Sequence, residues 1–256
     1  MNIAGLQKTT LVDFPGKIAA TVFTRGCTFR CPFCHNPELV LPDRFIPLMD
    51  EEEILAFFEK RKHQLQGVCI TGGEPTLQKD LPQFIHILKE MGYAIKLDTN
   101  GSIPEMLETL IKSGNLDYIA MDIKTTLEKY SSVAISNFKF QISNQLSNEQ
   151  LENDKMNGKW KMENVRLMAD IKKSINLIMS SDIDYEFRTT VCHPIHKVPD
   201  FEDIGKLIKG SKRYFIQNFV KSKHVDEHEN FESFTDLELS EAKKIVEQYI
   251  KEVEIR

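Results

Sequence analysis

Short β-branched segments alternate with longer amphipathic segments along most of the chain. The short segments predict strands at 18–24, 67–72, 93–99, 116–123, 183–191 and 213–220. Between them, apolar residues at helical spacing predict helices over 49–63, 79–92, 104–114, 161–181, 201–210 and 236–253. This alternation is typical of repeated β/α units around a parallel sheet. The pattern therefore predicts an α/β fold with six such units in a single domain over 1–256.

Residues 131–160 interrupt the alternation between the fourth strand and its expected helix. The segment is rich in Asn, Ser, Gln and Lys and has no sustained apolar period. Because such a composition buries little apolar surface, we interpret it as a low-complexity insertion within the domain. A solvated loop is the simpler interpretation, and a partner-binding arm is the alternative.

Composition and charge restrict the classes of partner. Hydrophobic residues make up 41% and charged residues 28% of the 256 positions, which is a globular mixture. The net charge of -5 argues against a nucleic-acid partner, because proteins that bind the phosphate backbone usually carry a basic excess. The sequence has neither an apolar run of about 18 residues nor a signal-peptide core at its start. We therefore expect a cytoplasmic protein without a membrane partner.

Cys27, Cys31 and Cys34 lie directly after the first predicted strand. With His35 they could form a Cys3His zinc site, but adjacent ligands rarely both reach one tetrahedral ion, and no second cysteine pair follows. Iron–sulfur clusters are also held by thiolates, and a cubane with only three protein thiolates leaves one iron open. The amino and carboxylate groups of S-adenosylmethionine (SAM) could chelate that iron. A zinc or cluster protein without catalytic activity is the alternative.

Polar or glycine-rich residues follow five of the six predicted strands. They are the cysteine loop, TGGEP at 71–75, DTNG at 98–101, MDIK at 121–124 and FRTT at 187–190. Each segment taken alone could be an ordinary turn. Because the carboxyl ends of parallel strands meet at one edge of the sheet, the five segments together predict one shared site.

The spacing C-x3-C-x2-C followed by GGEP resembles the radical SAM superfamily, whose core is a partial (β/α)6 barrel with a parallel sheet. The segments LVDFPGK, CPFCHN, DTNG and MDIK resemble its glycyl-radical-enzyme activases, such as those of pyruvate formate-lyase and anaerobic ribonucleoside-triphosphate reductase. The resemblance covers most of the chain apart from the insertion. It implies an oxidoreductase that cleaves SAM reductively with a [4Fe-4S] cluster. The resulting 5′-deoxyadenosyl radical would generate a glycyl radical on a partner enzyme, and we expect anaerobic ribonucleotide reductase.

The cofactor-binding residues follow from the resemblance by matching position. The three clustered cysteines, Cys27, Cys31 and Cys34, would bind the [4Fe-4S] cluster and are the catalytic ligands. The residues expected at SAM are Phe33, His35, Gly72, Gly73, Glu74, Asp98, Thr99, Asn100, Asp122 and Lys124. Gly72, Gly73 and Glu74 would line the amino group of SAM, and Lys124 would neutralise its carboxylate. The aromatic rings at 33 and 35 would lie beside the adenine.

Further ligands follow from the same matching. Asp98, Thr99 and Asp122 match positions that hold a monovalent cation in the formate-lyase relative, so the resemblance implies such a cation here. Asp13, in the VDFPG turn, and Arg188, at the end of the fifth predicted strand, match positions that contact the partner's glycine-bearing loop.

Two departures from the activase pattern limit these expectations. The formate-lyase relative contacts the ribose with a histidine where this chain has Gln217 and Asn218. Cys69 and Cys192 are the only other cysteines and are too few for a second cluster, so an external electron donor such as flavodoxin or ferredoxin is implied. We expect both thiols to be buried. A radical SAM enzyme that acts on a small molecule, similar to 7-carboxy-7-deazaguanine synthase, is the alternative function.

Overall fold

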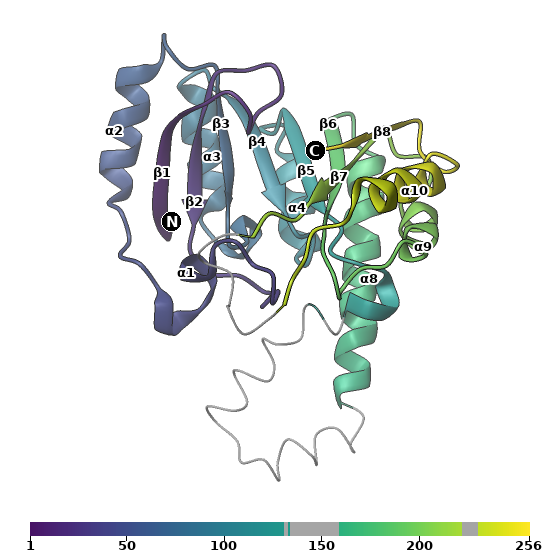
Figure 1. Cartoon of the computed structure of the whole chain (residues 1–256). Coiled ribbons are helices and arrows are strands. Elements are labelled where there is room, and N and C mark those ends of the chain that lie inside the picture. The colour runs from purple at the N-terminus through teal and green to yellow at the C-terminus, as the bar shows by residue number, and fades with distance from the viewer. Residues whose placement is uncertain (131–132, 134–158, 222–229) are drawn as a thin grey trace.

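The centre of the protein is one eight-stranded sheet whose strands follow in chain order (Figure 1). A computed structural model describes residues 1–130, 133, 159–221 and 230–256 of the chain, without the side chains of 159–163. The strands are β1 Ile3–Thr10, β2 Ala19–Thr24, β3 Gly67–Gly72, β4 Ala94–Thr99, β5 Tyr118–Asp122, β6 Asp184–Val191, β7 Arg213–Asn218 and β8 Glu252–Ile255. β1 is antiparallel to β2, whereas every later pair is parallel. Among the described strands β1 and β8 are the two ends of this order, so the barrel is open.

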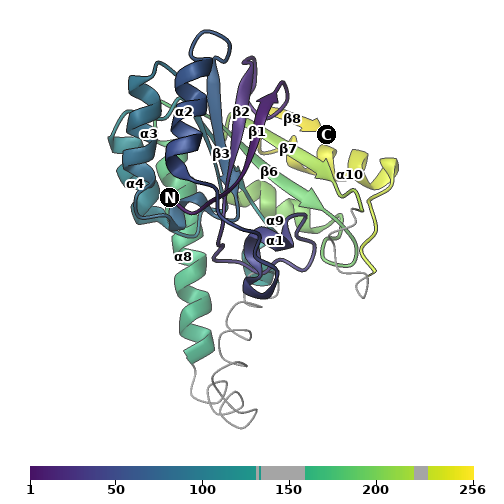
Figure 2. The same ribbon diagram turned by 90° about the vertical axis from the view of Figure 1, so that its left-hand side faces the viewer.

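Helices connect the parallel strands and cover one face of the sheet. They are α1 Pro37–Val40, α2 Glu51–Arg61, α3 Leu81–Glu90, α4 Pro104–Lys112, α8 Lys159–Met179, α9 Asp200–Leu207 and α10 Asp236–Val246. The described residues also include the 3-10 turns η1 Pro42–Arg44, η2 Pro75–Leu77 and η3 Leu127–Lys129. Figures 1 and 2 show α3, α4 and α8 on the same face of the sheet. In the described part of the chain, these three helices leave the other face of the sheet uncovered.

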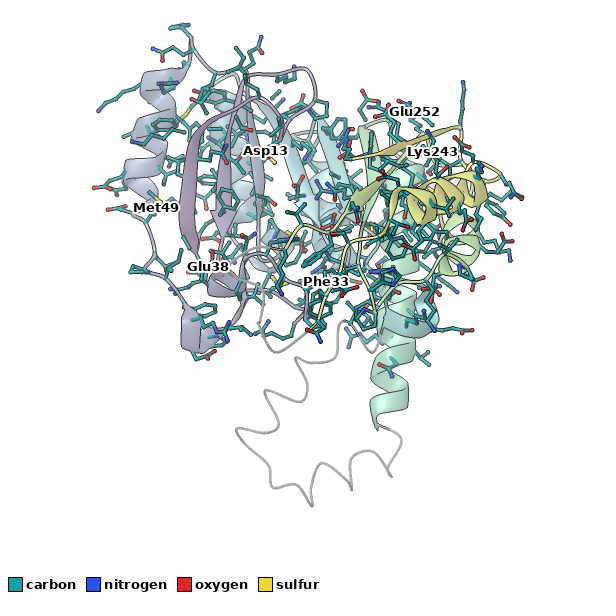
Figure 3. All side chains as sticks on the ribbon, in the orientation of Figure 1. Asp13, Phe33, Glu38, Met49, Lys243 and Glu252 are labelled. Atoms are coloured by element: carbon teal, nitrogen blue, oxygen red, sulfur yellow. The ribbon has the colours of Figure 1, made fainter. Side chains whose placement is uncertain are left out.

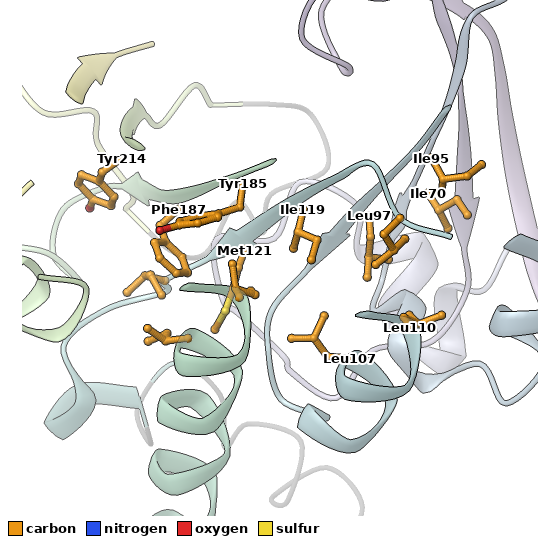
Figure 4. Packing of buried hydrophobic residues seen from close by; sticks show 14 of the residues in the cluster. Ile70, Ile95, Leu97, Leu107, Leu110, Ile119, Met121, Tyr185, Phe187 and Tyr214 are labelled. Carbon is orange, nitrogen blue, oxygen red and sulfur yellow. The ribbon is translucent and has the colours of Figure 1, made fainter. Parts of the chain in front are cut away.

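The helix-covered face of the sheet is apolar. Ile70, Leu97 and Ile119 on three neighbouring strands are fully buried. Leu107 and Leu110 of α4 pack against this face (Figure 4). Burying each such side chain stabilises the fold by about 1.5–3 kcal/mol. This face provides the main hydrophobic core, which fixes the positions of the central strands.

The opposite, concave face of the sheet is polar. Thr21, Cys69, Lys96 and Tyr118 stand side by side in register on β2 to β5. Because successive strand residues point to opposite faces, this row faces away from the helices. Phe14, in the turn between β1 and β2, is buried with its ring 6.2 Å from that of Tyr118. The concave face is thus covered at the amino ends of the strands and polar along its walls.

β2 to β7 confirm the six predicted strands, and the α/β fold is confirmed. The prediction of a helix over 236–253 is wrong at its end, because α10 stops at Val246 and β8 pairs with β7. β1 and β8 were not predicted. Edge strands bury only part of their surface and lack the continuous apolar run that marks the central strands. Of the predicted insertion, residues 131–132 and 134–158 lie outside the described residues. No helix in the described part is long and apolar enough to cross a bilayer.

Candidate active site

The carboxyl ends of β2 to β6 surround a cavity of about 200 Å³. It is lined by Cys27, Phe29, Cys31, Phe33, Cys34, His35, Asn36, Val40, Thr71, Gly72, Gly73, Glu74, Asp98, Thr99, Asn100, Asp122, Lys124 and Thr190. Every residue predicted to hold the cluster or SAM is in this set. A larger cavity of about 480 Å³ lies between η3, α8 and α9 and contains none of them. The smaller cavity is the candidate site because the reactive side chains converge there.

The cysteine loop is folded by its own backbone and by Arg30. The amide of Cys34 donates to the carbonyl of Cys31 at 3.1 Å, and Arg30 Nη1 donates to the carbonyls of Cys27 and Phe29, each at 2.9 Å. Burial, and next the charge of Glu74, raises the pKa of Cys27 to about 12. Burial raises the pKa of Cys31 to about 11, although Lys124 opposes it. A metal centre that binds here must therefore displace thiol protons.

The chemistry of the three thiols fits a cluster better than a single ion. No three His, Cys, Asp or Glu side chains of the described residues lie close enough together to hold one metal ion. A zinc site needs its ligands around one atom, whereas a cubane can bind each thiolate through a different iron. The loop therefore suits a [4Fe-4S] cluster with three protein ligands.

Gly72 and Gly73 bring the turn after β3 against the start of the cysteine loop. Gly72 has φ +118, which a residue with a side chain rarely adopts. A Cβ on Gly73 would lie 2.0 Å from the carbonyl oxygen of Gly26. The amides of Gly73 and Glu74 donate to the carbonyls of Thr24 and Gly26 at 2.9 and 2.8 Å. These glycines are therefore required for the packing of the two loops, a reason that the sequence did not reveal.

Glu74 is fully buried and joins the turns after β3 and β4. Its Oε1 accepts from the amide and hydroxyl of Thr76 at 3.1 and 2.5 Å and from the hydroxyl of Thr99 at 2.7 Å. Its Oε2 accepts from the amide of Asn100 at 2.7 Å. Burial raises the pKa of Glu74, and the hydrogen bonds from Thr76, Asn100 and Thr99 oppose that shift. Glu74 positions the cavity wall through these bonds.

Asn100 connects the turn after β4 to the cysteine loop. Its Nδ2 donates to the hydroxyl of Thr28 at 3.0 Å and lies 3.7 Å from Cys27 Sγ, within hydrogen-bond reach of sulfur. Its Oδ1 accepts from the amide of Ser102 at 2.9 Å. An N–H group directed at a ligating sulfur stabilises the thiolate and tunes a cluster's potential.

Two carboxylates and three cations form a buried network beside the cavity. Arg188 lies between the carboxylates, with Nη2 3.2 Å from Asp98 Oδ2 and Nε 2.7 Å from Asp122 Oδ1. Lys96 pairs with Asp98 Oδ1, and Lys124 donates to Asp122 Oδ2 at 2.9 Å. Burial would raise the pKa of Asp122, but Arg188 and Lys124 outweigh it and hold the pKa below its usual range. Burial would lower the pKa of Lys124, but Asp122 and Cys31 raise it. All five groups are therefore charged at neutral pH.

Aromatic rings form the wall of the cavity on the side of the cysteine loop. Phe33 is 3% exposed, and its ring meets those of His196 and Phe231 edge to face at 5.9 and 6.2 Å. The ring of His35 lies 5.3 Å from that of Phe219. The rings at 33 and 35 thus have fixed positions at the cavity, as flat surfaces that a purine ring could contact.

His196 was missed by the sequence argument, because a single histidine after a strand gives no pattern signal. Its Nδ1 accepts from the amide of Cys192 at 3.2 Å, so its Nε2 carries the hydrogen and donates to the carbonyl of Lys124 at 2.8 Å. Burial lowers the pKa of His196, although the hydrogen bond to the carbonyl of Lys124 opposes the shift. The neutral ring holds the backbone of Lys124 in place. Cys192 is buried, as predicted.

The two residues predicted to contact a partner do not line the cavity. Arg188 lies behind it, between the carboxylates, and is 14% exposed. Asp13 accepts from the hydroxyl of Thr21 at 2.6 Å. In Figure 3 Asp13 lies toward the opposite end of the strands from Phe33. The concave face thus separates Asp13 from the cavity end of the site.

Gln217 and Asn218, at the position of the ribose-contacting histidine in the formate-lyase relative, do not face the cavity. The side-chain amide of Asn218 is bonded to the backbone of Phe234 through both Nδ2 and Oδ1, each at 2.9 Å. Neither Asn218 nor Gln217 lines the cavity, whereas Thr190 at the end of β6 does. The FRTT segment contained a signal for Thr190, since its residues were expected at the rim.

Comparison with known proteins gives the family to which the chain belongs. A profile of the radical SAM superfamily matches residues 21–209. MJ1227 of Methanocaldococcus jannaschii, provisionally described as a glycyl-radical enzyme activating enzyme, is 32% identical over 256 residues, covering 99% of this chain and 95% of MJ1227. A Saccharolobus solfataricus protein provisionally described as a GTP 3′,8-cyclase is 34% identical over 115 residues, 43% of this chain and 37% of that protein.

One solved structure illustrates the similarity of the fold. Streptococcus suis SuiB has a TM-score of 0.59 at 13% identity, over 91% of this chain and 47% of SuiB. At this identity the likeness supports the fold alone. The profile match extends from β2 to α9 and includes all three clustered cysteines. The chain belongs to the radical SAM superfamily.

Proposed function

We propose that the protein is an activating enzyme that generates a glycyl radical on a partner enzyme. The observation that carries this proposal is the likeness to MJ1227, which extends over 99% of the chain. The motifs LVDFPGK and CPFCHN point in the same direction, and on their account we propose an anaerobic ribonucleoside-triphosphate reductase as the partner.

The cavity has the donors that a [4Fe-4S] cluster and SAM require. Cys27, Cys31 and Cys34 would hold the cluster, and Asn100 would donate toward one of its sulfurs. When both are bound, the cluster and SAM supply the reductive cleavage of SAM that starts the radical chemistry. The protein's own task is to bind, to orient and to keep water out.

Lys124 is the residue best suited to orient SAM. Its ammonium lies at the cavity and is paired with Asp122, while His196 holds its backbone. The network of three cations and two carboxylates has one positive charge in excess, which favours the carboxylate of SAM. The aromatic side chains Phe33, Phe219 and Phe231 are each buried beside this end of the cavity and exclude water from it.

The concave face is the surface on which we propose that the partner's glycine-bearing loop lies. Arg188 and Asp13 both belong to this face, at the rim and near the amino end of β2 respectively. A polypeptide loop that runs along the face from the open edge would meet both residues. We further propose flavodoxin or ferredoxin as the electron donor, because the two remaining thiols, Cys69 and Cys192, are buried and too few to hold a second cluster.

A small-molecule substrate is the second candidate. The match to the described GTP 3′,8-cyclase favours it, but that match covers only 43% of this chain. Radical SAM enzymes with different substrates have the cofactor-binding part in common, so a match over this share of the chain is expected between them. The full-length likeness to MJ1227 therefore favours the activase.

Anaerobic reconstitution with iron and sulfide, followed by product analysis, separates the candidates. We expect 5′-deoxyadenosine from SAM and dithionite in the reconstituted protein, and an organic radical on the partner only when partner and activase are mixed. Release of 5′-deoxyadenosine with no radical on any partner, together with turnover of a small molecule, would replace the activase proposal. If a fully loaded cluster yields no 5′-deoxyadenosine, the radical chemistry itself is refuted.

A further inference from the structure

The network beside the cavity leaves no carboxylate oxygen of Asp98 or Asp122 without a protein cation. Lys96 is on Asp98 Oδ1, and Arg188 is 3.2 Å from Asp98 Oδ2 through Nη2. Arg188 Nε donates to Asp122 Oδ1 at 2.7 Å, and Lys124 donates to Asp122 Oδ2 at 2.9 Å. The guanidinium therefore occupies the position between the two acids, on adjacent strands, where an ion would have to be bound.

Thr99, the third residue expected to bind a monovalent cation, forms hydrogen bonds with other residues instead. The hydroxyl of Thr99 donates to Glu74 at 2.7 Å and accepts from the amide of Gly101 at 3.1 Å. Thr99 also follows Asp98 directly on β4, so the two side chains point to opposite faces of the sheet. In the described part of the chain, no three acidic, cysteine or histidine side chains converge on one ion position. As arranged, these residues do not fit a cation.

Charge balance points the same way. Three cations already face two carboxylates in a buried environment, where like charges repel strongly. Another positive ion would have to displace Arg188, which is 14% exposed and bound at both ends of its guanidinium. Its two terminal nitrogens still have hydrogens to donate, so this position is compatible with a contact to a partner.

We propose that Arg188 takes the place of a monovalent cation in this protein, so that SAM binding is independent of K+ and Na+. The proposal rests on the SAM site of the proposed function, but not on the activase reaction. Arg188 acts as a positioning residue: it holds Asp98 and Asp122 at a fixed separation and leaves Lys124 at the cavity. The same two acids without the guanidinium would form a site with the carboxylate ligands that a hard cation prefers.

The test is SAM affinity of the cluster-loaded full-length chain in KCl, NaCl or choline chloride at equal ionic strength. The wild-type affinity is expected to be the same in all three salts. Arg188→Gln removes the charge and is expected to bind SAM at least about tenfold more tightly in KCl than in choline chloride, because K+ then pairs with the exposed acids. Arg213→Gln is the matched control. Arg213 lies on the same concave face and contacts Tyr118 and Asp184, but it contacts neither carboxylate of the network.

Thermal unfolding of the full-length chain without its cluster gives a second readout that needs neither SAM nor a partner. The wild-type midpoint is expected to be equal in KCl and choline chloride, and the Arg188→Gln midpoint to rise in KCl only. A saturable K+ stabilisation of the wild type, or a tenfold K+ requirement for its SAM affinity, overturns the proposal. If Arg188→Gln does not fold, these wild-type measurements decide by themselves. Absence of glycyl radical formation would refute only the activase.

Discussion

The helix-covered face and the concave face of the sheet are equally deeply buried along their centres but differ in how burial is made favourable. Ile70 and Ile119 on the helix side are fully buried among aliphatic side chains. On the concave side Lys96 and Glu186 are each only 2% exposed. Glu186 accepts from the hydroxyl of Tyr118 at 2.9 Å, and Lys96 pairs with an acid.

The difference separates stability from chemistry. Apolar burial contributes to folding in proportion to the area removed from water. A buried ion pair contributes little net stability, because desolvation cancels most of its attraction, but removing one partner leaves an uncompensated charge. Changes to the helix side should therefore lower the free energy of unfolding, whereas changes at the rim that leave no buried charge unpaired should mainly alter cofactor binding. Four variants test this division.

The largest expected effect is at the rim. Cys31→Ala should abolish both the cluster and 5′-deoxyadenosine formation while leaving the thermal midpoint of the cluster-free chain nearly unchanged. The reason is that a cubane held by two protein thiolates lacks the third ligand the loop provides. Iron and sulfide content, with product analysis, measures the loss. Cys69→Ala is the control and should retain the cluster, because that thiol lies on β3 outside the loop.

Next in size is a change on the helix side. Phe187→Ala should lower the free energy of unfolding by about 3–5 kcal/mol, because this ring is fully buried in the main core and leaves a cavity. Denaturant unfolding measures it, and cluster loading at low temperature should persist. Leu237→Ala, at a 69% exposed side chain, should change the free energy by less than about 0.5 kcal/mol. Loss of the cluster in folded Phe187→Ala would contradict the division.

Glu74→Gln is expected to have an intermediate effect on both properties. The Gln side chain keeps one acceptor but sets an NH2 group against the amide of Asn100, which costs about 1–3 kcal/mol. SAM affinity should fall as the turn after β4 shifts. Isothermal titration calorimetry measures SAM affinity, and denaturant unfolding measures the free energy of unfolding. Glu105→Gln, at an exposed residue paired with Lys173, is the control and should leave SAM affinity unchanged.

The smallest expected effect is a pH dependence. Burial keeps His196 neutral in the folded protein, whereas the unfolded chain takes up a proton below about pH 6.5. The contribution of His196 is thus present above that pH and is lost as pH falls through the lower pKa of the folded state. Between about pH 7.5 and about pH 5.5, the wild type should lose more unfolding free energy than His196→Asn, by about 1 kcal/mol. A larger loss in the variant would contradict this assignment.

The exposed His86 on α3 provides the control for that measurement. His86→Asn should match the wild type in this measurement, because the side chain of His86 is exposed and is not part of the buried core. If both histidine variants change the pH dependence of the unfolding free energy equally, the effect does not come from burial of His196.

Much of the fold could be predicted because the central strands are buried on both sides. Their continuous β-branched runs, such as GVCITG in β3, differ clearly from the amphipathic helices between them. At the edges, β1 ends in the polar run QKTT and β8 has only the four residues EVEI, and the segment after Val246 could be mistaken for more of α10. These segments form strands because they pair with β2 and β7, and the sequence of a single segment does not reveal such pairing.

The candidate site was predictable in its residues and less so in their contacts. The cysteine spacing, the strand-end rule and the family resemblance together identified most of the residues that line the cavity, although not Val40. The position of Arg188 between two acids depends on the register of β4, β5 and β6, and only the folded chain shows it. The bond from His196 to Lys124 joins residues 72 positions apart in the chain and had no sequence signal.

The most direct test of the central claim is isotope transfer from the partner enzyme. An anaerobic ribonucleotide reductase labelled with deuterium at the glycine Cα is mixed with the reconstituted protein, SAM and a reductant. Mass spectrometry of the 5′-deoxyadenosine then reports the source of its added hydrogen. The account predicts deuterium in this product, together with a radical on the partner. Release of 5′-deoxyadenosine without deuterium, while a small molecule is consumed, would contradict it.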